Sequence, residues 1–469
     1  MSAEKKQSSL LQRREGNIAD TPRSGEGVIP KIPFALQPVF SEANIELEKI
    51  TIPGIGKVFL TYEKESTPEH YAYSGIRVLS PMTDEEAVIN AKRLSLTSSS
   101  WKNWIINHAV KDGVLADVPA ELSKLLPIEV RTAEGREIYG GRAIIIPDEG
   151  TYMDTGESID AILKDASHPL FAEVSAPIYK AIGVRLNELE GKLKVTPDFG
   201  PNASTADVLH KYTDHVLGIR EEDNGSGGKS PYSITSILES LETLGLLGKP
   251  KDTPITLIGA AGALGSGVRE YLAKQGFTNV VLCDLQYDAP SCDHEGLESS
   301  FPAGWSIAPS VNGKFSDTCL ERGGWLITTA FGDEMKNSQW DKLQPGTVWI
   351  GAQNKDLPEG AAGIQFARNL KAMDVVHIPG QILTIGGTTA SWIEWKARQE
   401  QVKFSKEAAH SVVKAVAGHV VGHIYEQSQT KETTPYEELL GYASKAHWQE
   451  KTWQQAIACN SSGFGIAKL

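Results

Sequence analysis

The sequence predicts an α/β protein with two domains, and two observations support this prediction. The chain has 469 residues, which is more than one hydrophobic core usually organises. From about Ser233 onward, short apolar stretches alternate with helical ones, a pattern typical of a parallel sheet covered by helices. We therefore expect an N-terminal α/β domain, a second domain built on a parallel sheet, and C-terminal helices that pack back on the first domain.

The domain boundaries are expected where the composition changes. Residues 1–30 are polar and charged, which is typical of a disordered arm. Residues 221–229 are rich in turn formers and predict a surface loop between a first domain at 31–220 and a second at 221–390. The remaining residues, 391–469, are expected to form the returning helices.

The first domain is expected to mix strands and helices. Residues 45–62 alternate apolar and polar side chains around a Pro-Gly pair, which predicts two strands joined by a turn. The acidic run after Thr83 predicts a helix to about Leu96, because acidic side chains stabilise a helix N-terminus. The apolar run at 142–146 predicts a buried strand, and helices are expected over 156–194.

The second domain is expected to hold five strands connected by helices. Its strands are predicted at 255–258, 280–283, 325–328, 348–350 and 375–378. Two long helices are then expected at 405–428 and 436–459. The histidines at 410, 419 and 423 lie on a helical stretch, and the i,i+4 spacing of the last two could bind a metal, but no acidic or cysteine ligand has a matching offset, so we expect a packed or exposed helix face. The tryptophans at 392, 395, 448 and 453 also have helical spacing, and we expect them to pack in the core or an oligomer interface.

The composition excludes several kinds of partner. A net charge of −13 argues against nucleic acid and against an anionic membrane surface. No apolar stretch approaches the ~20 residues that cross a bilayer. The four cysteines form no CxxC pair, and no secretory leader is apparent, which favours reduced thiols and a cytoplasmic location.

The strongest motif lies directly after the strand predicted at 255–258. Gly259 suits a tight turn, Gly262 lets the backbone approach a pyrophosphate, and Ala263, Leu264 and Gly265 begin a helix whose free N–H groups attract anions. The next strand ends in Asp284, which is placed to bind the ribose hydroxyls of a dinucleotide. No Arg or Lys follows this acid directly, so the motif favours NAD over NADP in a Rossmann-type domain.

The alternative is a purely structural glycine turn, because glycine-rich turns also occur without ligands. The spacing is GxxGxxG and not GxGxxG, which suggests a loop that is one residue longer. Thr329 and Ala330, which follow the strand predicted at 325–328, are further candidates for contact with the cofactor.

Several short motifs, in the same order along the chain, resemble the glutamate/leucine/phenylalanine/valine dehydrogenase family, and its branched-chain and aromatic members most. The resemblance extends from about residue 70 to 395. It is carried by Tyr73-Ser-Gly75-Ile-Arg77, Thr83-Asp-Glu-Glu-Ala, Ser100-Trp-Lys102-Asn103, Thr196-Pro-Asp198-Phe-Gly200, Asp207 to Gly218, Gly351-Ala-Gln-Asn354 and Ile378 to Gly387.

The resemblance implies a role for each matching position. Lys102 would bind the substrate α-carboxylate through a charge-assisted contact, and Asp198 would transfer the proton at the amino nitrogen. Gly75 and Thr213 would border the substrate, while Asn354 and Ser233 would contact the nicotinamide side of the cofactor. The alternatives are that Lys102 is an ordinary surface lysine and that Asp198 is a turn residue. Asn354 and Ser233 could likewise be an ordinary loop residue and an ordinary helix-start residue.

The sequence departs from the family at Arg142. At this place the family carries a lysine that activates water or ammonia, and burial lets such a lysine exchange protons. Arginine cannot be deprotonated at working pH, so Arg142 could only stabilise an oxyanion or bind a carboxylate. Residues 103–139 also make the spacing from Lys102 much longer than in the family, which marks an insertion beside the expected site.

Tyr73 bears on the substrate side chain. Glutamate-specific relatives place a lysine near this position, so a phenol argues against glutamate and for an apolar, aromatic or hydroxylated side chain. The alternative is a strand aromatic that packs in the first domain.

The resemblance implies an NAD-dependent oxidoreductase that acts at the α-carbon of an apolar or aromatic amino acid or its 2-oxo acid, as a homo-oligomer of cytoplasmic subunits. The first domain would then bind substrate and mediate oligomerisation. Because of Arg142, two alternatives stay open: a reductase of imines or specialised metabolites that needs no free ammonia, and a non-catalytic descendant that binds NAD and a ligand.

Overall fold

The computed structural model describes residues 11–13, 45–133, 136–153, 155–165, 167–197, 202–288, 292–308, 317–330, 340–353, 356–357 and 361–443. Most of the arm expected at 1–30 lies outside these ranges. Its residues Leu11–Arg13 form the short strand β1, which pairs with β6 (Thr151–Met153), so this piece differs from the expected disorder. The expected fold class is confirmed, because the described chain forms two separate larger sheets with helices on their faces.

The first large sheet is mixed and has the strand order β2-β3-β5-β4-β7. Strands β2, β3 and β5 pair in antiparallel fashion, whereas β4 is parallel to both β5 and β7. Every residue of β5 is buried, as expected for the apolar run at its centre. The strands are β2 (Ile45–Ile52), β3 (Gly56–Glu63), β4 (Ala72–Val78), β5 (Tyr139–Pro147) and β7 (Leu193–Pro197).

Two helices cover the opposite faces of this sheet. Helix α3 (Asp84–Leu94) packs against Ile144 and Ile146 of β5, and its N-terminus carries a capping box between Thr83 and Glu86. Helix α8 (Phe171–Glu188) packs against the other face. The alternation of side chains along β5 therefore divides the core into two layers.

A π-helix interrupts the helical segment that was expected to end near Leu96. The π-helical turn η2 (Ser95–Ser100) runs directly into α4 (Trp101–Lys111). The segment expected as an insertion continues with η3 (Val114–Asp117), α5 (Ala120–Ser123) and α6 (Ile128–Arg131). Other short elements of this half are α7 (Ile159–Lys164) and α9 (Asn202–His210).

The second sheet is parallel throughout, with the order β10-β9-β8-β11-β12-β13. Numbered within the sheet, this is the order 3-2-1-4-5-6 of doubly wound dinucleotide-binding folds. The first three strands are therefore added toward one edge of the sheet and the last three toward the other, so the topological switch point lies between β8 and β11. The strands are β8 (Ile255–Ile258), β9 (Val280–Cys283), β10 (Ser306–Ile307), β11 (Trp325–Thr328), β12 (Val348–Gly351) and β13 (Val376–Ile378).

The five strands predicted here agree with the structure to within one residue at each end. The additional strand β10 escaped prediction because two residues carry no periodicity. The main helices of this half are α10 (Ser230–Thr243), α11 (Ala263–Lys274), α12 (His294–Ser299) and α15 (Ala361–Ala372), and α13 (Asp317–Leu320) is a single turn.

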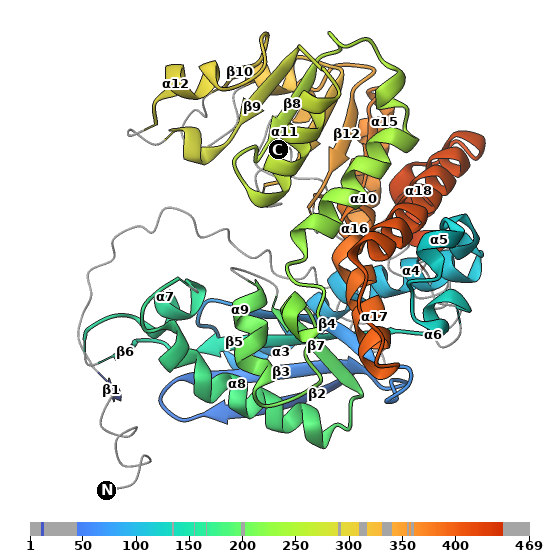
Figure 1. Ribbon diagram of the computed structural model, residues 1–469. Helices are drawn as coiled ribbons and strands as arrows, with labels where there is room; N and C mark the ends of the chain where they lie inside the picture. Colours follow the sequence, from blue (N-terminus) through green and yellow to red (C-terminus); the bar gives the residue numbers. More distant parts are fainter. Residues whose placement is uncertain are drawn as a thin grey trace, which may run out of the picture.

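The C-terminal helices pack back on the first half, as expected. Helices α16 (Gly380–Leu383), α17 (Ile385–Gln399) and α18 (Lys406–Thr430) contact α4 as well as α10, so one apolar core spans both halves. Figure 1 shows α10, α17 and α18 along the side of the molecule that joins the two sheets. Helix α19 (Pro435–Tyr442) follows, and the rest of the helix expected to 459 lies outside the described residues.

The histidines of α18 take part in packing contacts, as expected. His419 lies 2.9 Å from Asp112 through its Nε2 atom, and the His419 and His423 rings stack at 6.1 Å. Within the ranges given above, no group of His, Cys, Asp and Glu could hold a metal ion, and no helix is both long and apolar enough to span a bilayer.

We predict that Gly140→Ala destabilises the fold by about 3 kcal/mol, at the upper end of the cost of overpacking a core. A Cβ atom at Gly140 would lie 2.6 Å from the backbone nitrogen of Ser100, so the π-helical turn would have to shift. Urea unfolding measures the effect. Gly248→Ala is the control, because a Cβ there meets nothing within 4 Å, and an equal loss in both variants would contradict the prediction.

Candidate functional site: a cationic cleft between the two sheets

A cleft of about 230 Å³ lies where the first half of the chain meets the second. The first half contributes residues of β4, η2, α4, β5 and β7, and the second contributes the start of α10, the start of α11 and the α16–α17 junction. Six residues predicted from the sequence share this lining, namely Tyr73, Gly75, Lys102, Arg142, Ser233 and Leu264. The other lining residues are Ser74, Ser98, Ser99, Asn103, Thr196, Lys229, Ser230, Thr384, Gly387 and Thr388.

Lys102 is positioned by the π-helical turn that precedes it. The amide of the next residue, Asn103, donates hydrogen bonds to the carbonyl oxygens of Tyr73 (3.2 Å) and Tyr139 (2.8 Å), which fixes the start of α4 over β4 and β5. π-Helical turns are rare and occur often at functional sites. The ammonium group of Lys102 is thus carried on rigid structure at the wall of the cleft.

Glu63 links the π-helical turn η2 to strand β5. Its Oε1 atom accepts hydrogen bonds from the Ser100 hydroxyl (2.6 Å) and from the backbone N–H of Gly140 (2.8 Å). Gly140 lacks a side chain at the point of closest approach, so η2 can lie against β5. This approach brings the serines of η2 to the cleft.

Arg142 lies in the fully buried strand β5 and is 2% exposed. Its Nη1 atom donates a 3.4 Å hydrogen bond to the Ser74 hydroxyl, which is hydrogen-bonded in turn to Ser99. A guanidinium ion keeps its charge at any pH at which the protein is folded. The structure therefore places a permanent cation at the position where the family resemblance led us to expect a lysine.

A lysine that the sequence analysis missed lines the opposite wall. Lys229 was assigned to a surface loop, but its side chain is only 13% exposed. Its Nζ atom donates to the hydroxyls of Ser391 (2.5 Å) and Ser226 (2.9 Å). Tyr73 reaches the same Ser391 hydroxyl at 2.6 Å, so these polar groups form a connected chain across the cleft wall.

Glu394 lies behind Lys229 and is completely buried. Its carboxylate accepts the backbone N–H of Gly218 at 2.9 Å and that of Ser226 at 3.1 Å, and it also accepts the Ser226 hydroxyl. Lys229 lies 3.7 Å away and Arg398 3.9 Å away. Burial lowers the pKa of Lys229 from its ordinary value, whereas the negative charge of Glu394 acts to raise it.

The loop at 221–229 is therefore only partly a surface loop. Its first turn, η4 (Glu221–Asp223), is exposed, but Gly225 and Ser226 are buried under α17. The high content of turn-forming residues in this segment correctly predicted an irregular backbone. It could not predict burial, because the partner that satisfies this backbone, Glu394, is 168 residues away.

The glycine motif forms the turn that was expected of it. Gly259 has a φ of +81°, and a Cβ atom there would lie 2.6 Å from the Ala330 nitrogen. A Cβ atom at Gly265 would lie 2.0 Å from the Gly259 oxygen, so the helix can approach the strand only with glycine here. Gly262 is the N-cap of α11, which leaves the first N–H groups of this helix directed outward.

Asp284 and Thr329 border the same turn. Asp284 Oδ2 accepts a 2.8 Å hydrogen bond from the N–H of Ala261, and the Thr329 hydroxyl donates to the carbonyl oxygens of Ile258 (2.9 Å) and Gly259 (3.0 Å). The motif thus lies at the carboxyl ends of β8, β9 and β11, at the switch point of the sheet. An open glycine turn, an uncapped helix N-terminus and a carboxylate at this place fit a dinucleotide.

Three residues predicted near the substrate or the nicotinamide could not be placed at the cleft. Asp198 and Asn354 lie outside the described residues. Thr213 is described but lies elsewhere: its hydroxyl donates to Asn187 Oδ1 at 2.7 Å and accepts the N–H of His215 at 3.1 Å. It therefore shapes the turn after α9 and is absent from the described lining of the cleft.

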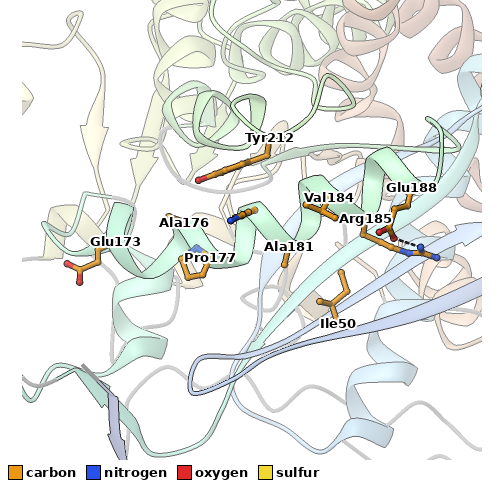
Figure 2. A pocket seen from close by; sticks show the side chains of 10 residues that line it. Ile50, Glu173, Ala176, Pro177, Ala181, Val184, Arg185, Glu188 and Tyr212 are labelled. Carbon is orange, nitrogen blue, oxygen red and sulfur yellow. Dashed lines mark hydrogen bonds and ion pairs between the residues drawn. The ribbon is translucent and has the colours of Figure 1, made fainter. Parts of the chain in front are cut away.

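A larger and more open hollow lies on the outer face of α8, beside β2 (Figure 2). Ala176, Ala181 and Val184 line it together with Ile50, and an ion pair of 2.6 Å joins Arg185 to Glu188 at one end. The residues that line it include none of those predicted from the sequence. Its chemistry is that of an ordinary helix face, so we place the functional site in the cationic cleft.

Fold and cleft together define a two-domain α/β protein in which a doubly wound sheet presents a nucleotide-type glycine turn beside a cationic pocket. No family model matches the chain. Phenylalanine dehydrogenase of Caldalkalibacillus thermarum is 23% identical over 311 residues, which covers 66% of this chain and 74% of that protein. Leucine dehydrogenase of Bacillus subtilis is 19% identical over 61% of this chain and 68% of its own length.

Solved structures show the same fold. L-Tryptophan dehydrogenase from Nostoc punctiforme superposes with a TM-score of 0.58 and 14% identity over 91% of this chain and all of that chain. Hetero-hexameric glutamate dehydrogenase from Thermus thermophilus superposes with a TM-score of 0.55 and 14% identity over 92% of this chain and 95% of that one. The chain therefore shares the fold of these amino-acid dehydrogenases and is similar in sequence to two of them.

We predict that Glu394→Ala costs about 3–5 kcal/mol of stability, because it leaves buried cations and backbone N–H groups without their partner. Chemical denaturation measures the loss. Glu426→Ala, on the exposed face of α18, is the control and should stay within about 0.5 kcal/mol of the parent. A small effect at position 394 would show that the buried carboxylate does not stabilise the junction.

Proposed function

We propose that this protein is an NAD-dependent oxidoreductase that acts at the α-carbon of an amino acid or of the matching 2-oxo acid. The observation that carries the proposal is the shared lining of the cleft. Lys102 and Arg142 on one wall face the same cavity as Leu264, which follows the glycine turn at the start of α11. A substrate held by the cations would therefore lie beside the place where the glycine turn fits a dinucleotide. The dehydrogenase relatives support the same class of reaction.

Residues at the glycine turn would hold the cofactor. The N–H groups at the start of α11 suit its pyrophosphate, and Asp284 suits its adenosine ribose. Leu285, Gln286 and Tyr287 follow that acid, so no neighbouring cation favours the 2′-phosphate of NADP. When bound, NAD accepts the α-hydrogen of the amino acid as a hydride. Further contacts are proposed for Ala263, Gly265, Thr329, Ala330, Ser233 and Asn354.

Residues of the first sheet would bind and orient the substrate. Lys102 would pair with the α-carboxylate, Gly75 would allow it to approach β4, and Asp198 would exchange the proton of the amino group. Arg142 would stabilise negative charge on the oxygen of the 2-oxo acid, which requires a fixed cation and no proton transfer.

The lining of the cleft also bears on the substrate side chain. Nine of the described lining residues carry a hydroxyl group, and Leu264 is the sole aliphatic one among them. The relatives named for phenylalanine, leucine and tryptophan favour an apolar or aromatic side chain. Because these hydroxyls make the lining polar, we propose a side chain that carries a hydrogen-bonding group over a purely aliphatic one.

A second candidate function follows from Arg142. A permanent cation cannot activate ammonia, which favours a reductase that takes a preformed imine over one that needs free ammonia. The dependence of the reductive rate on ammonia distinguishes the two.

Three broader expectations also remain proposals. The division at 31–220, 221–390 and 391–469, with an insertion at 103–139, awaits a test by limited proteolysis. A homo-oligomer is proposed from the resemblance to the family, and one structure of the same fold is a hetero-hexameric dehydrogenase. A cytoplasmic location is proposed from the cysteine content.

We predict that the protein reduces NAD with at least one amino acid, and that Arg142→Met lowers kcat/KM by ~100-fold because it removes the fixed cation. Arg142→Lys should retain more activity at neutral pH than at high pH, because a buried lysine loses its charge as the pH rises. NADH absorbance across aliphatic, aromatic, hydroxylated and acidic amino acids is the measurement. The dehydrogenase proposal fails if no amino acid, oxo acid or imine changes the redox state of NAD.

We predict that Gly262→Ala weakens NAD binding by at least ~10-fold, equal to about 1.4 kcal/mol. The new Cβ would touch only the Gly259 oxygen, at 3.5 Å, so folding should be unchanged while the methyl group blocks the approach of a pyrophosphate. Calorimetry measures the affinity, and an unchanged Tm together with Gly248→Ala controls for folding. Equal affinities in parent and variant would place the cofactor elsewhere.

A further inference from the structure

Lys229 is the residue of the cleft that neither the motifs nor the resemblance assigns. It directly precedes α10, in the segment where the chain passes from the first sheet to the second. Its side chain lines the cleft together with Lys102 and Arg142 but belongs to the opposite wall. A substrate that binds these two cations would therefore share the cleft with Lys229.

The reaction proposed above requires a group that Arg142 cannot supply. Conversion of an imine to an oxo acid needs a base that takes a proton from water and an acid that returns it. Arginine does neither at working pH. A lysine can do both when burial shifts its proton equilibrium toward neutral pH.

We propose that Lys229 is the acid–base group that activates water in this cleft, in place of the residue at position 142. This inference rests on the proposed function. Lys229 is suited to the task because its Nζ atom is held by two neutral hydroxyls, those of Ser391 and Ser226, at 2.5 and 2.9 Å. Both hydroxyls accept from Lys229, because that of Ser226 donates to Glu394 and that of Ser391 donates to the Gly387 carbonyl oxygen. A neutral amine still has two N–H groups for them, which leaves its lone pair to take a proton.

The proton balance of the step is complete. The neutral amine of Lys229 takes one proton from water while the water oxygen bonds to the iminium carbon, and the C=N π electrons return to nitrogen. The lysine ammonium then protonates this nitrogen. The C–N bond breaks with its electron pair on nitrogen, the hydroxyl proton passes to the departing ammonia, and the oxo acid and an ammonium ion remain.

Charged and titratable groups on every neighbouring element act on Lys229. Glu394 of α17 favours the ammonium form, while burial favours the amine form. The balance lowers the pKa of Lys229 below its ordinary value. The groups that face it are Glu394 and Arg398 on α17, Tyr73 on β4, Lys102 on α4 and Arg142 on β5.

The sign of the pH dependence follows from this assignment. In the deaminating direction Lys229 must be neutral, so kcat should rise as the pH rises through its pKa. In the aminating direction the same neutral form is required, because the lysine takes a proton from the nitrogen of the added ammonia before it returns that proton to the departing water, and the rate should rise over the same range. A lysine that only completes an ion pair with Glu394 would produce no such rise in either direction.

The test compares Lys229→Arg and Lys229→Ala with the parent enzyme and with the exposed-surface control Lys249→Met. We expect both substitutions at 229 to lower kcat by ~100-fold or more with little change in KM, and to remove the rising limb of the kcat profile. Added methylamine and ethylamine should partly restore kcat to Lys229→Ala, with the more basic free amine acting better. Melting temperatures confirm that the variants are folded.

Several outcomes would overturn the assignment. Retention of the pH limb in Lys229→Arg, or a loss confined to KM for substrates with an acidic side chain, would make Lys229 a binding residue. A fall in Tm without rescue by amines would make it structural. If the parent enzyme itself leaves NAD unchanged with every substrate, the proposed function and the role of Lys229 fall together, whereas an active parent with an unaffected Lys229→Arg overturns the role of Lys229 alone.

Discussion

The arrangement of this protein depends on one buried carboxylate, Glu394. It receives backbone N–H groups from the segment that joins the two sheets, at Gly218 and Ser226, and lies near the cations Lys229 and Arg398. A buried ion is costly unless all its hydrogen-bonding capacity is satisfied, so such a site tolerates few alternative arrangements. Glu394 thereby holds helix α17, the connecting segment and the cleft wall in one geometry.

The cations of the cleft have different chemical capacities. Arg142 is planar and permanently charged, and its strand is buried along its whole length, so it can stabilise charge but cannot move a proton. Lys229 donates hydrogen bonds to the hydroxyls of Ser226 and Ser391, and its burial lowers its pKa. A cleft that contains both kinds of cation can separate charge stabilisation from proton transfer, which a single lysine would otherwise combine. The substitution at position 142 need not abolish chemistry in this fold.

Local features of the fold were predictable. The strands of the parallel sheet appear as short apolar runs between helical stretches, and Gly259, Gly262 and Gly265 occur in direct succession, so their turn could be assigned from neighbouring residues alone. The cleft was predictable in part, because Lys102 and Arg142 belong to recognisable motifs. Lys229 was missed because its burial depends on Ser391 and Glu394, more than 160 residues further along the chain. The π-helical turn was missed because it is held by Glu63, whose carboxylate accepts hydrogen bonds from both Ser100 and Gly140, and no local periodicity reveals this contact.

By itself the sequence determined the two-domain α/β class, the doubly wound sheet and the glycine turn, since each depends on periodicity or on backbone freedom within a few residues. Only the tertiary structure decided which side chains share the cleft. Burial and hydrogen bonding between distant segments turned a predicted surface lysine into a cleft residue and placed Thr213 in a turn. These outcomes depend on desolvation, which acts on a side chain through every element packed around it and therefore leaves no trace in its immediate sequence.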